Sequence, residues 1–330
     1  MEKELYQPKT LMDAIKFFAD INNCFAYLIP IRWPNGITCP NCEGTEHSFL
    51  STRNVWKCKA CKKQFSLKQG TIMEDSPLGY DKWMTAIWMI AADKNGVSSY
   101  EVSRSIGITQ KSAWFLLHRI RLAMKTGSFL KMAGTVECDE TFIGGKAKNM
   151  HKERRENLIK GRGAVGKAIV MGILERGDKE TGKPSQMTAM VVSDRTTETL
   201  QGKVRENVEA GSDVMTDEWV GYEGLDADYV HNVINHSVKY AEGAIHTNSA
   251  ENFWTLFKRC INGTYVSVEA DHLEAYIDEE AFRFNERKGK DNDRFVKVLQ
   301  GISGRRVTYK ELIATEDGVS RRGEMRELKK

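Results

Sequence analysis

The 330-residue chain contains no apolar run that approaches the ~18–20 residues of a membrane-spanning helix. Its first residues, Met1-Glu-Lys-Glu-Leu5, lack the features of a secretory signal peptide. We therefore expect a cytoplasmic protein, in which cysteines stay reduced unless they bind a metal. The sequence shows no internal repeat, and its 41% apolar and 28% charged residues are typical of a globular protein with two or three domains.

A large charge of one sign is also missing, because the net charge is only +4. This total is too small to indicate nucleic-acid binding, but the charge is unevenly distributed. Residues 1–133 hold 18 Lys and Arg against 11 Asp and Glu, whereas residues 134–330 hold 31 against 34. A basic N-terminal part followed by an acidic part suits DNA binding and metal-dependent catalysis. Ordinary solvated surfaces are the alternative explanation.

Two C-x-x-C pairs, Cys39-Pro-Asn-Cys42 and Cys58-Lys-Ala-Cys61, are separated by fifteen residues. Each pair can bind one side of a tetrahedral Zn²⁺, and the residues between them suffice for a short hairpin. A redox pair is the alternative, but it leaves the second pair unexplained. Four thiolates leave no open position for water, so we predict a structural zinc ribbon over residues 37–72. The remaining cysteines are expected to be packed thiols: Cys24, Cys138 and Cys260.

The predicted ribbon is basic and has no acidic residue between positions 51 and 68. Its basic side chains alternate with Trp56 and Phe65, a composition that favours contact with DNA phosphates. We predict that four of its lysines contact DNA: Lys57, Lys59, Lys62 and Lys63. A second basic stretch, residues 144–166, is interpreted as a mobile loop that contacts DNA.

Helices are expected on both sides of the ribbon. Residues 10–30 have the apolar spacing of one amphipathic helix, within an N-terminal segment 1–36. Residues 73–133 form a helical domain with helix-turn-helix features: Ser98 or Ser99 can cap a first helix, Gly107 makes the turn and Thr109 caps a second. Such patterns also occur as plain packing units. The residues predicted to contact DNA here are Gln110, Lys111, Ser112 and Arg119.

Residues 134–290 alternate between expected strands and helices, which is the pattern of an α/β domain. Strands are expected at 135–143, 167–175, 187–193, 213–216 and 229–234. Helices are expected at 197–210, 248–261 and 270–285. Residues 291–330 are expected to form a charged C-terminal tail.

Two acids on expected strands suit a metal-binding site. In the strand at 135–143, Glu137 and Asp139 share one face, while Val136 and Cys138 share the other. Asp217 ends a second short strand, which is where an α/β site would hold an acid. A solvated strand residue is the alternative for any single Asp.

The expected helix at 248–261 offers two candidates for a third ligand. Asn248 and Glu251 are three residues apart and share one helix face with Lys258. Glu251 is the better ligand for a hard cation because it is anionic, whereas Asn248 can instead cap the helix. Lys258 is predicted to contact a phosphate, although a surface lysine is the usual explanation for a single Lys.

This ordered series of residues resembles bacterial insertion-sequence transposases of the DDE superfamily, in the subgroup with a zinc ribbon and an ISXO-like catalytic domain. The resemblance covers about residues 10–290 and includes the four cysteines of the ribbon. Its other motifs are Arg32-Trp-Pro34, Gly70-Thr71, Val136-Glu-Cys-Asp-Glu-Thr-Phe-Ile-Gly-Gly145, Thr216-Asp-Glu218, His246-Thr-Asn-Ser-Ala-Glu-Asn-Phe-Trp254, Lys258-Arg259, Gly263-Thr-Tyr265, His272-Leu273 and Phe282-Arg-Phe-Asn-Glu-Arg287.

The resemblance implies an α/β RNase H-like catalytic domain, with a mixed sheet flanked by helices, preceded by the zinc ribbon and the helix-turn-helix-like domain. It also implies terminal inverted repeats as the double-stranded DNA substrate, and an oligomer on DNA that is at least a dimer. Members of this subgroup use Asn or Glu as the third catalytic residue, so Asn248 and Glu251 both stay open.

The predicted function is a transposase that binds these inverted repeats, then cleaves and joins DNA with Mg²⁺ or Mn²⁺. Asp139 would bridge two ions, with Asp217 holding one and Glu251 or Asn248 the other. One alternative is a two-metal nuclease of the same fold that does not join DNA. Another is a DNA-binding regulator with an inactive catalytic domain.

Overall fold

The computed structural model describes residues 6–125, 131–144, 167–178, 180–234 and 246–314. It divides the chain into two compact units: unit 1 comprises Met1–Lys125 and Gly289–Lys330, and unit 2 comprises Thr126–Lys288. Across the described ranges, every helix is too short or too polar to cross a membrane. The basic stretch 144–166, predicted to contact DNA, lies outside the described residues apart from Gly144.

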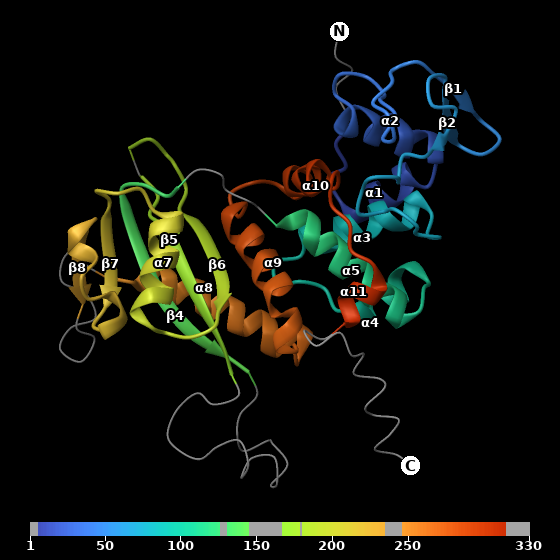
Figure 1. Cartoon of the computed structure of the whole chain (residues 1–330). Helices are drawn as coiled ribbons and strands as arrows, with labels where there is room; N and C mark the ends of the chain where they lie inside the picture. Colours follow the sequence, from blue (N-terminus) through green and yellow to red (C-terminus); the bar gives the residue numbers. More distant parts are fainter. Residues whose placement is uncertain (1–5, 126–130, 145–166, 179, 235–245, 315–330) are drawn as a thin grey trace, which may run out of the picture. The chain divides into compact units, whose positions relative to one another are not determined.

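Unit 1 begins with two helices, α1 (Leu11–Phe18) and α2 (Ile21–Arg32) (Figure 1). The prediction of one helix over residues 10–30 was wrong at the junction between them. Asp20 has extended backbone there, and its carboxylate accepts the N–H of Asn22 at 2.9 Å. This side chain caps a new helix, which is why the first one does not continue.

A small antiparallel sheet follows, made of β1 (His47–Leu50), β2 (Val55–Cys58) and β3 (Gln64–Phe65). Trp56 of β2 is buried, and its ring packs on those of Phe65 and Trp33 with centroid distances of 5.9 and 5.5 Å. A sheet of this size buries little apolar surface by itself. It therefore depends on this aromatic packing and on the cysteine cluster described below.

Three further helices of unit 1 are α3 (Tyr80–Ala92), α4 (Ser99–Ile106) and α5 (Gln110–Met124). The hydroxyl of Ser98 caps α4, and that of Thr109 caps α5. Between them Gly107 has φ +63°, a left-handed conformation that glycine adopts at low cost. The predicted turn and the cap at Thr109 are confirmed, and Ser98 rather than Ser99 caps the first helix.

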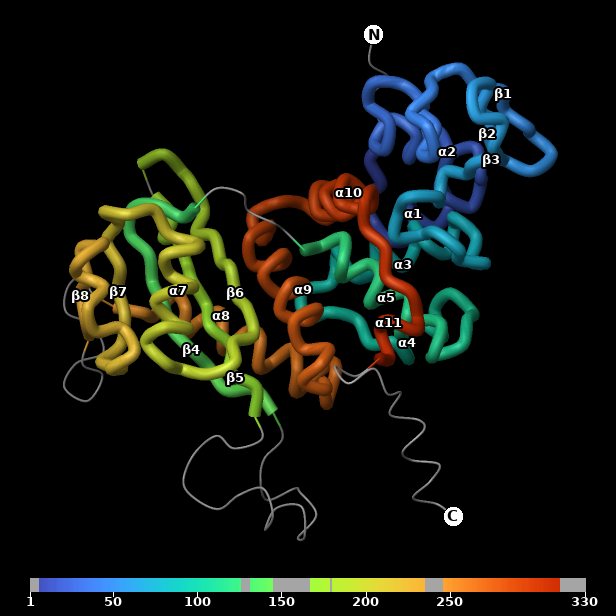
Figure 2. The backbone as a smooth tube through the Cα atoms, in the orientation of Figure 1, coloured from blue at the N-terminus to red at the C-terminus, as the bar shows by residue number. Residues whose placement is uncertain are grey.

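The chain returns to unit 1 at its C-terminal end with α10 (Asp291–Gln300) and α11 (Tyr309–Ile313). Helix α10 lies beside α3 (Figure 2). Phe295 of α10 is fully buried, with its ring 5.7 Å from that of Phe18 and 5.2 Å from that of Trp88. Residues 291–300, expected to belong to a charged tail, are thus a helix of the core.

Unit 2 is built on one five-stranded sheet with the order β6-β5-β4-β7-β8. Its strands are β4 (Thr135–Ile143), β5 (Ala168–Glu175), β6 (Gln186–Val192), β7 (Asp213–Asp217) and β8 (Val230–Ile234). Strands β4, β5 and β6 are antiparallel neighbours, whereas β7 and β8 run parallel to β4. The predicted mixed α/β sheet is confirmed.

Helices cover both faces of this sheet (Figure 1). One face packs on α7 (Thr197–Asn207) through residues such as Val136, Cys138 and Val204. The other packs on α8 (Asn248–Cys260) and α9 (Leu273–Asn285) through residues such as Phe253 and Ile277. The described residues of unit 2 also form short helices: the 3-10 helices Val220–Tyr222, Leu225–Ala227 and Ala270–His272, and the π-helix Ile261–Tyr265.

Candidate functional site

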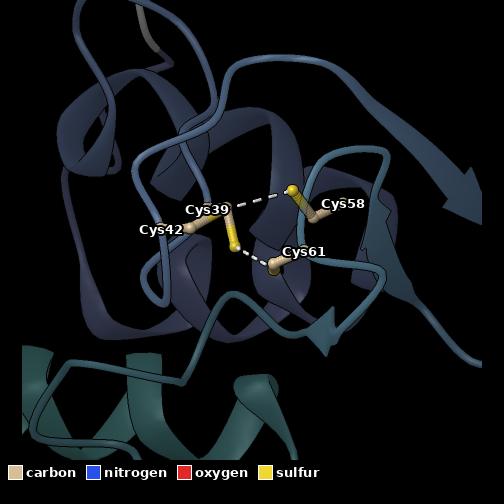
Figure 3. A group of neighbouring side chains, drawn as sticks. All are labelled: Cys39, Cys42, Cys58 and Cys61. Atoms are coloured by element: carbon tan, nitrogen blue, oxygen red, sulfur yellow. Dashed lines mark hydrogen bonds between the residues drawn. The ribbon is translucent and has the colours of Figure 1, made fainter.

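The four predicted zinc ligands come together in unit 1. The sulfur atoms of Cys39, Cys42, Cys58 and Cys61 all lie within 4.8 Å of one another, and their side chains point toward a common centre (Figure 3). The Sγ–Sγ distance is 3.7 Å for Cys39–Cys61 and 3.6 Å for Cys42–Cys58. Four sulfurs bound to zinc at ~2.3 Å in a tetrahedron are ~3.8 Å apart. The cluster therefore fits a structural zinc ion, as predicted.

The backbone around the cluster favours the thiolate form that zinc binds. Burial opposes ionisation of Cys39, but hydrogen bonds from the backbone of Asn41 and Cys42 and from the Cys61 thiol lower its pKa to about 7. Backbone N–H groups of Cys61 and Ala60 also lower the pKa of Cys58. The turns within the two C-x-x-C pairs thus favour thiolates at Cys39 and Cys58. At Cys61 a backbone hydrogen bond is outweighed by burial and the neighbouring thiols, which raise its pKa to about 11.

The predicted DNA-contacting lysines of the ribbon are all exposed: Lys57, Lys59, Lys62 and Lys63. Lys59 forms an exposed ion pair with Glu46 at 3.8 Å, which contributes little to stability. The ammonium group of Lys62 donates to the carbonyl oxygen of Lys59 at 2.6 Å. These cations are therefore accessible on the ribbon surface, as phosphate contact requires.

Three predicted DNA contacts lie in the first turn of α5. Gln110 donates through Nε2 to the hydroxyl of Ser99 at 2.9 Å, which joins α5 to α4. Lys111 is exposed, with its ammonium 5.1 Å from the centre of the Tyr309 ring. Ser112 is also exposed and shares a hydrogen bond with the hydroxyl of Thr109.

Arg119 differs from the other predicted DNA contacts because its side chain is buried. It donates to the carbonyl oxygen of Glu74, and its guanidinium lies 5.3 Å from the centre of the Trp83 ring. Burial lowers the pKa of Arg119 to about 10. This residue ties α5 to neighbouring segments of unit 1, so the prediction that it contacts DNA does not fit its position.

In unit 2, Asp139 lies in the middle of β4, opposite Gly172 of β5. Its Oδ2 accepts a hydrogen bond from Trp254 Nε1 of α8 at 3.0 Å. A Cβ atom at Gly172 would lie 2.6 Å from the Trp254 ring, so a larger residue there would displace the indole. A glycine inside an apolar strand is the sequence signal for such close approach, and it was missed.

Asp217 lies on the strand next to Asp139. The parallel pairs of β4 and β7 include Thr135 with Asp213 and Glu137 with Met215. Continuing this register by two residues aligns Asp139 with Asp217 at the end of β7. Oδ1 of Asp217 accepts the backbone N–H of Trp219 at 3.0 Å, which orients the carboxylate.

The electrostatics of Asp139 reflect its crowded surroundings. Burial raises its pKa to about 7, and the negative charges of Glu140 and Asp217 act in the same direction. The hydrogen bond from Trp254 opposes this rise in part. A carboxyl group in such surroundings is stabilised by binding either a proton or a cation. Asp139 and Asp217 therefore form a suitable start for a divalent metal site.

Helix α8 carries the remaining candidates, and all three are exposed: Asn248, Glu251 and Lys258. At 3.6 residues per turn, Glu251 and Lys258 lie about 60° and about 40° around the helix from Trp254, whereas Asn248 lies about 120° away. Because Trp254 contacts Asp139, Glu251 is on the side of α8 nearer the strand acids. The alternative role of Asn248 as the helix cap was wrong, since Thr247 occupies that position.

The acidic candidates are more widely spaced than the cysteines. Among the described residues, the cysteine cluster is the group of three or more possible ligands whose donor atoms all lie within 4.8 Å. Asp139, Asp217 and Glu251 do not meet in this way.

Comparison with known proteins gives two family matches. Residues 131–285 match the ISXO2-like transposase domain, and residues 21–64 match the transposase zinc-ribbon domain. A protein described as belonging to transposable element ISH50 of Halobacterium salinarum is 24% identical over 278 residues, which is 81% of this chain and 91% of the relative. A transposase-like protein of Haemophilus influenzae is 33% identical over 111 residues, which is 33% of this chain and 89% of the relative.

Proposed function

Because this chain belongs to the ISXO2-like transposases, we propose that it binds the terminal inverted repeats of an insertion sequence and catalyses DNA cleavage and strand transfer there. Family membership supports a transposase as the general activity. We extend this general activity with a substrate, the inverted repeats, with metal-dependent chemistry and with roles for individual residues.

We propose that residues 134–290 form an RNase H-like catalytic domain. Three antiparallel strands followed by two strands parallel to the first, with helices on both faces, support this assignment. The observation that carries the function is that Asp139 and Asp217 lie on neighbouring parallel strands, with α8 joined to Asp139 through Trp254. Both strand acids alternate with residues that pack on α7, so they lie on the face of the sheet that α8 covers.

In the proposed mechanism, Asp139, Asp217 and Glu251 would hold two divalent ions, with Asp139 as the ligand shared by both. Mg²⁺ or Mn²⁺ bound there lowers the pKa of the attacking water or 3′-hydroxyl and stabilises the leaving oxygen. Asp139 must lose its proton to take this role, and its raised pKa makes that step dependent on pH. Lys258 is proposed to contact a phosphate beside Glu251.

Glu251 is a better third residue than Asn248 for two reasons. Its carboxylate is anionic, and a hard cation binds such a ligand more strongly than a neutral amide. It also lies nearer to Trp254 around the helix, and therefore nearer to Asp139.

For DNA binding we propose the zinc ribbon over residues 37–72 and the helical domain over residues 73–133. The exposed lysines of the ribbon and the exposed first turn of α5 support contacts to phosphates and to base edges, respectively. Two consecutive helices, α4 and α5, joined by a turn at Gly107 support the proposed helix-turn-helix. Because two transposon ends must be joined together, we propose that the active form on DNA is at least a dimer.

The test uses purified protein, DNA that carries the flanks of this gene, and Mg²⁺ or Mn²⁺. We expect cleaved and strand-joined products from the natural protein and none from Asp217→Asn. Asp213→Asn is the matched control, because Asp213 is exposed at the other end of the same strand. Cleavage without joining would indicate a nuclease of the same fold. Specific binding without cleavage would indicate a regulator.

A further inference from the structure

Glu137 lies two residues before Asp139 on the same face of β4, yet its surroundings are different. Its side chain is 0% exposed, and both carboxylate oxygens already accept hydrogen bonds. Oε1 accepts from Arg176 Nε at 2.6 Å. Oε2 accepts the backbone N–H groups of Ser249 and Ala250, each at 2.9 Å. A carboxylate enclosed in this way is not available to a metal ion.

The two N–H groups that Glu137 accepts belong to the first turn of α8. The first four N–H groups of a helix have no partner within the helix, and a capping side chain usually accepts one or two of them. Thr247 occupies the cap position of α8, but its side chain makes no capping hydrogen bond. Glu137 supplies this acceptor from a neighbouring strand instead. Its negative charge also suits the positive end of the helix dipole.

A second contact fixes the residue that precedes the helix. Arg176, which neutralises Glu137, donates through Nη2 to the carbonyl oxygen of His246 at 2.6 Å. The same nitrogen lies 2.9 Å from His246 Nδ1. One buried ion pair therefore holds both the approach to α8 and its first turn. Further along the helix, Trp254 is held by Asp139, so Glu251 lies between two attachment points.

We propose that Glu137 is a positioning residue for the third metal ligand: by holding the first turn of α8 against β4, it keeps Glu251 beside Asp139. This inference depends on the proposed role of Glu251 in metal binding. The attachment of α8 to β4 does not depend on that role, and it can be tested separately.

The first experiment measures the attachment itself. In Glu137→Gln, an amide N–H₂ replaces one acceptor oxygen, so either Arg176 or the first turn of α8 loses its partner. The reporter is the ¹⁵N–¹H resonance of the Trp254 indole, identified with Trp254→Phe. We expect this resonance to shift or broaden in Glu137→Gln. An unchanged resonance in a folded variant would overturn the proposal.

A matched control is Glu279→Gln in α9. Glu279 is also 0% exposed and also pairs with an arginine, and its described partners, Arg283 and Tyr265, lie outside the first turn of α8. It should leave the Trp254 resonance in place while lowering thermal stability. Arg176→Lys is the milder second variant if Glu137→Gln does not fold. Lysine keeps the positive charge but lacks the second guanidinium nitrogen that donates to His246. We therefore expect a smaller shift of the same resonance.

The second experiment measures Mn²⁺ affinity in Glu137→Gln, in Glu251→Gln and in the double variant. Residues that support a metal ligand typically change affinity by ~10–100-fold. We expect about a tenfold loss for Glu137→Gln alone and no further loss when Glu251 is already changed. Additive losses would overturn the proposal and make Glu137 an independent contributor. If the natural protein binds no Mn²⁺, the proposed function fails, while the Trp254 resonance still decides the attachment.

Discussion

The two predicted metal-binding regions of this chain are assembled in opposite ways. The four cysteines lie within residues 39–61, on two turns of one small sheet. The acids Asp139, Asp217 and Glu251 come from two strands and a helix of a five-stranded sheet. The first site depends on local spacing, whereas the second depends on strand register and helix docking. Two sites in one chain therefore differ in how far a short motif determines them.

The two sites also differ in what the fold would lose without metal. The ribbon has a small core, so zinc supplies much of its folding free energy. Around the acids, the two apolar faces of the sheet form the core without any ion. The ionised form of Asp139 destabilises the folded protein, because burial and neighbouring negative charges raise its pKa. Zinc thus stabilises the fold in the first region, whereas the proposed divalent ions would relieve repulsion in the second.

The largest expected effect is the loss of zinc from the ribbon. Cys58→Ser removes one of four thiolates, and structural zinc contributes ~10–16 kcal/mol of binding free energy in small domains. We expect zinc content to fall and the ribbon to unfold. Trp56 should then lose the fluorescence typical of a buried tryptophan, and residues 37–72 should be cleaved rapidly by a protease. Cys24→Ala, at a buried thiol outside the cluster, should retain zinc. Full zinc content in Cys58→Ser would contradict this assignment.

The next effect concerns catalysis without unfolding. Asp139→Asn removes the proposed bridging charge, which is worth several kcal/mol, so metal-dependent cleavage should fall by ~10³-fold or more. Its melting temperature should stay the same or rise, since a destabilising charge is removed. Cleavage rates and thermal unfolding measured side by side test this contrast with the ribbon. A variant that cleaves normally would show that Asp139 is not a ligand.

A smaller effect is expected on DNA affinity when the four exposed lysines of the ribbon are changed to Gln together: Lys57, Lys59, Lys62 and Lys63. Each lost phosphate contact lowers the slope of log affinity against log salt by ~0.9, so the slope should fall by ~3–4. Arg119→Gln should instead lower thermal stability, because Arg119 is buried. Binding measured across a salt series separates these outcomes, and an unchanged slope for the lysine variant would contradict surface contact.

The smallest effect is on the pH dependence of stability. The pKa of Asp139 is about 7 in the folded protein and 3.8 without perturbation, so the folded state binds this proton more tightly. The stability of the Mg²⁺-free protein should therefore decline as pH rises from about 4 to about 7. Melting temperatures from about pH 5.5 to about pH 8 should show a steeper decline in the natural protein than in Asp139→Asn. Equal slopes would contradict the raised pKa.

Much of the secondary structure of unit 2 follows from the sequence, because its apolar residues recur with the spacing of a strand or of a helix. Predictions failed where a single side chain decided the outcome. Asp20 ends one helix and caps the next, which apolar spacing alone does not indicate. Arg119 carries the positive charge typical of a DNA contact, but its side chain is buried and donates to the carbonyl oxygen of Glu74. Phe295 joins the core of unit 1 from far along the chain, so a charged segment became a core helix.

By itself, the sequence determined the zinc cluster and the order of strands and helices in unit 2, since both arise from short-range spacing of cysteines and apolar residues. It also presented Asp139, Asp217, Asn248 and Glu251 as candidates, without choosing between the last two. Tertiary structure decided that Gly172 admits the Trp254 ring beside Asp139 and that Glu137 caps α8 from a neighbouring strand. These contacts join residues far apart in the chain, and they form because sheet register and helix docking bring their partners within hydrogen-bonding distance.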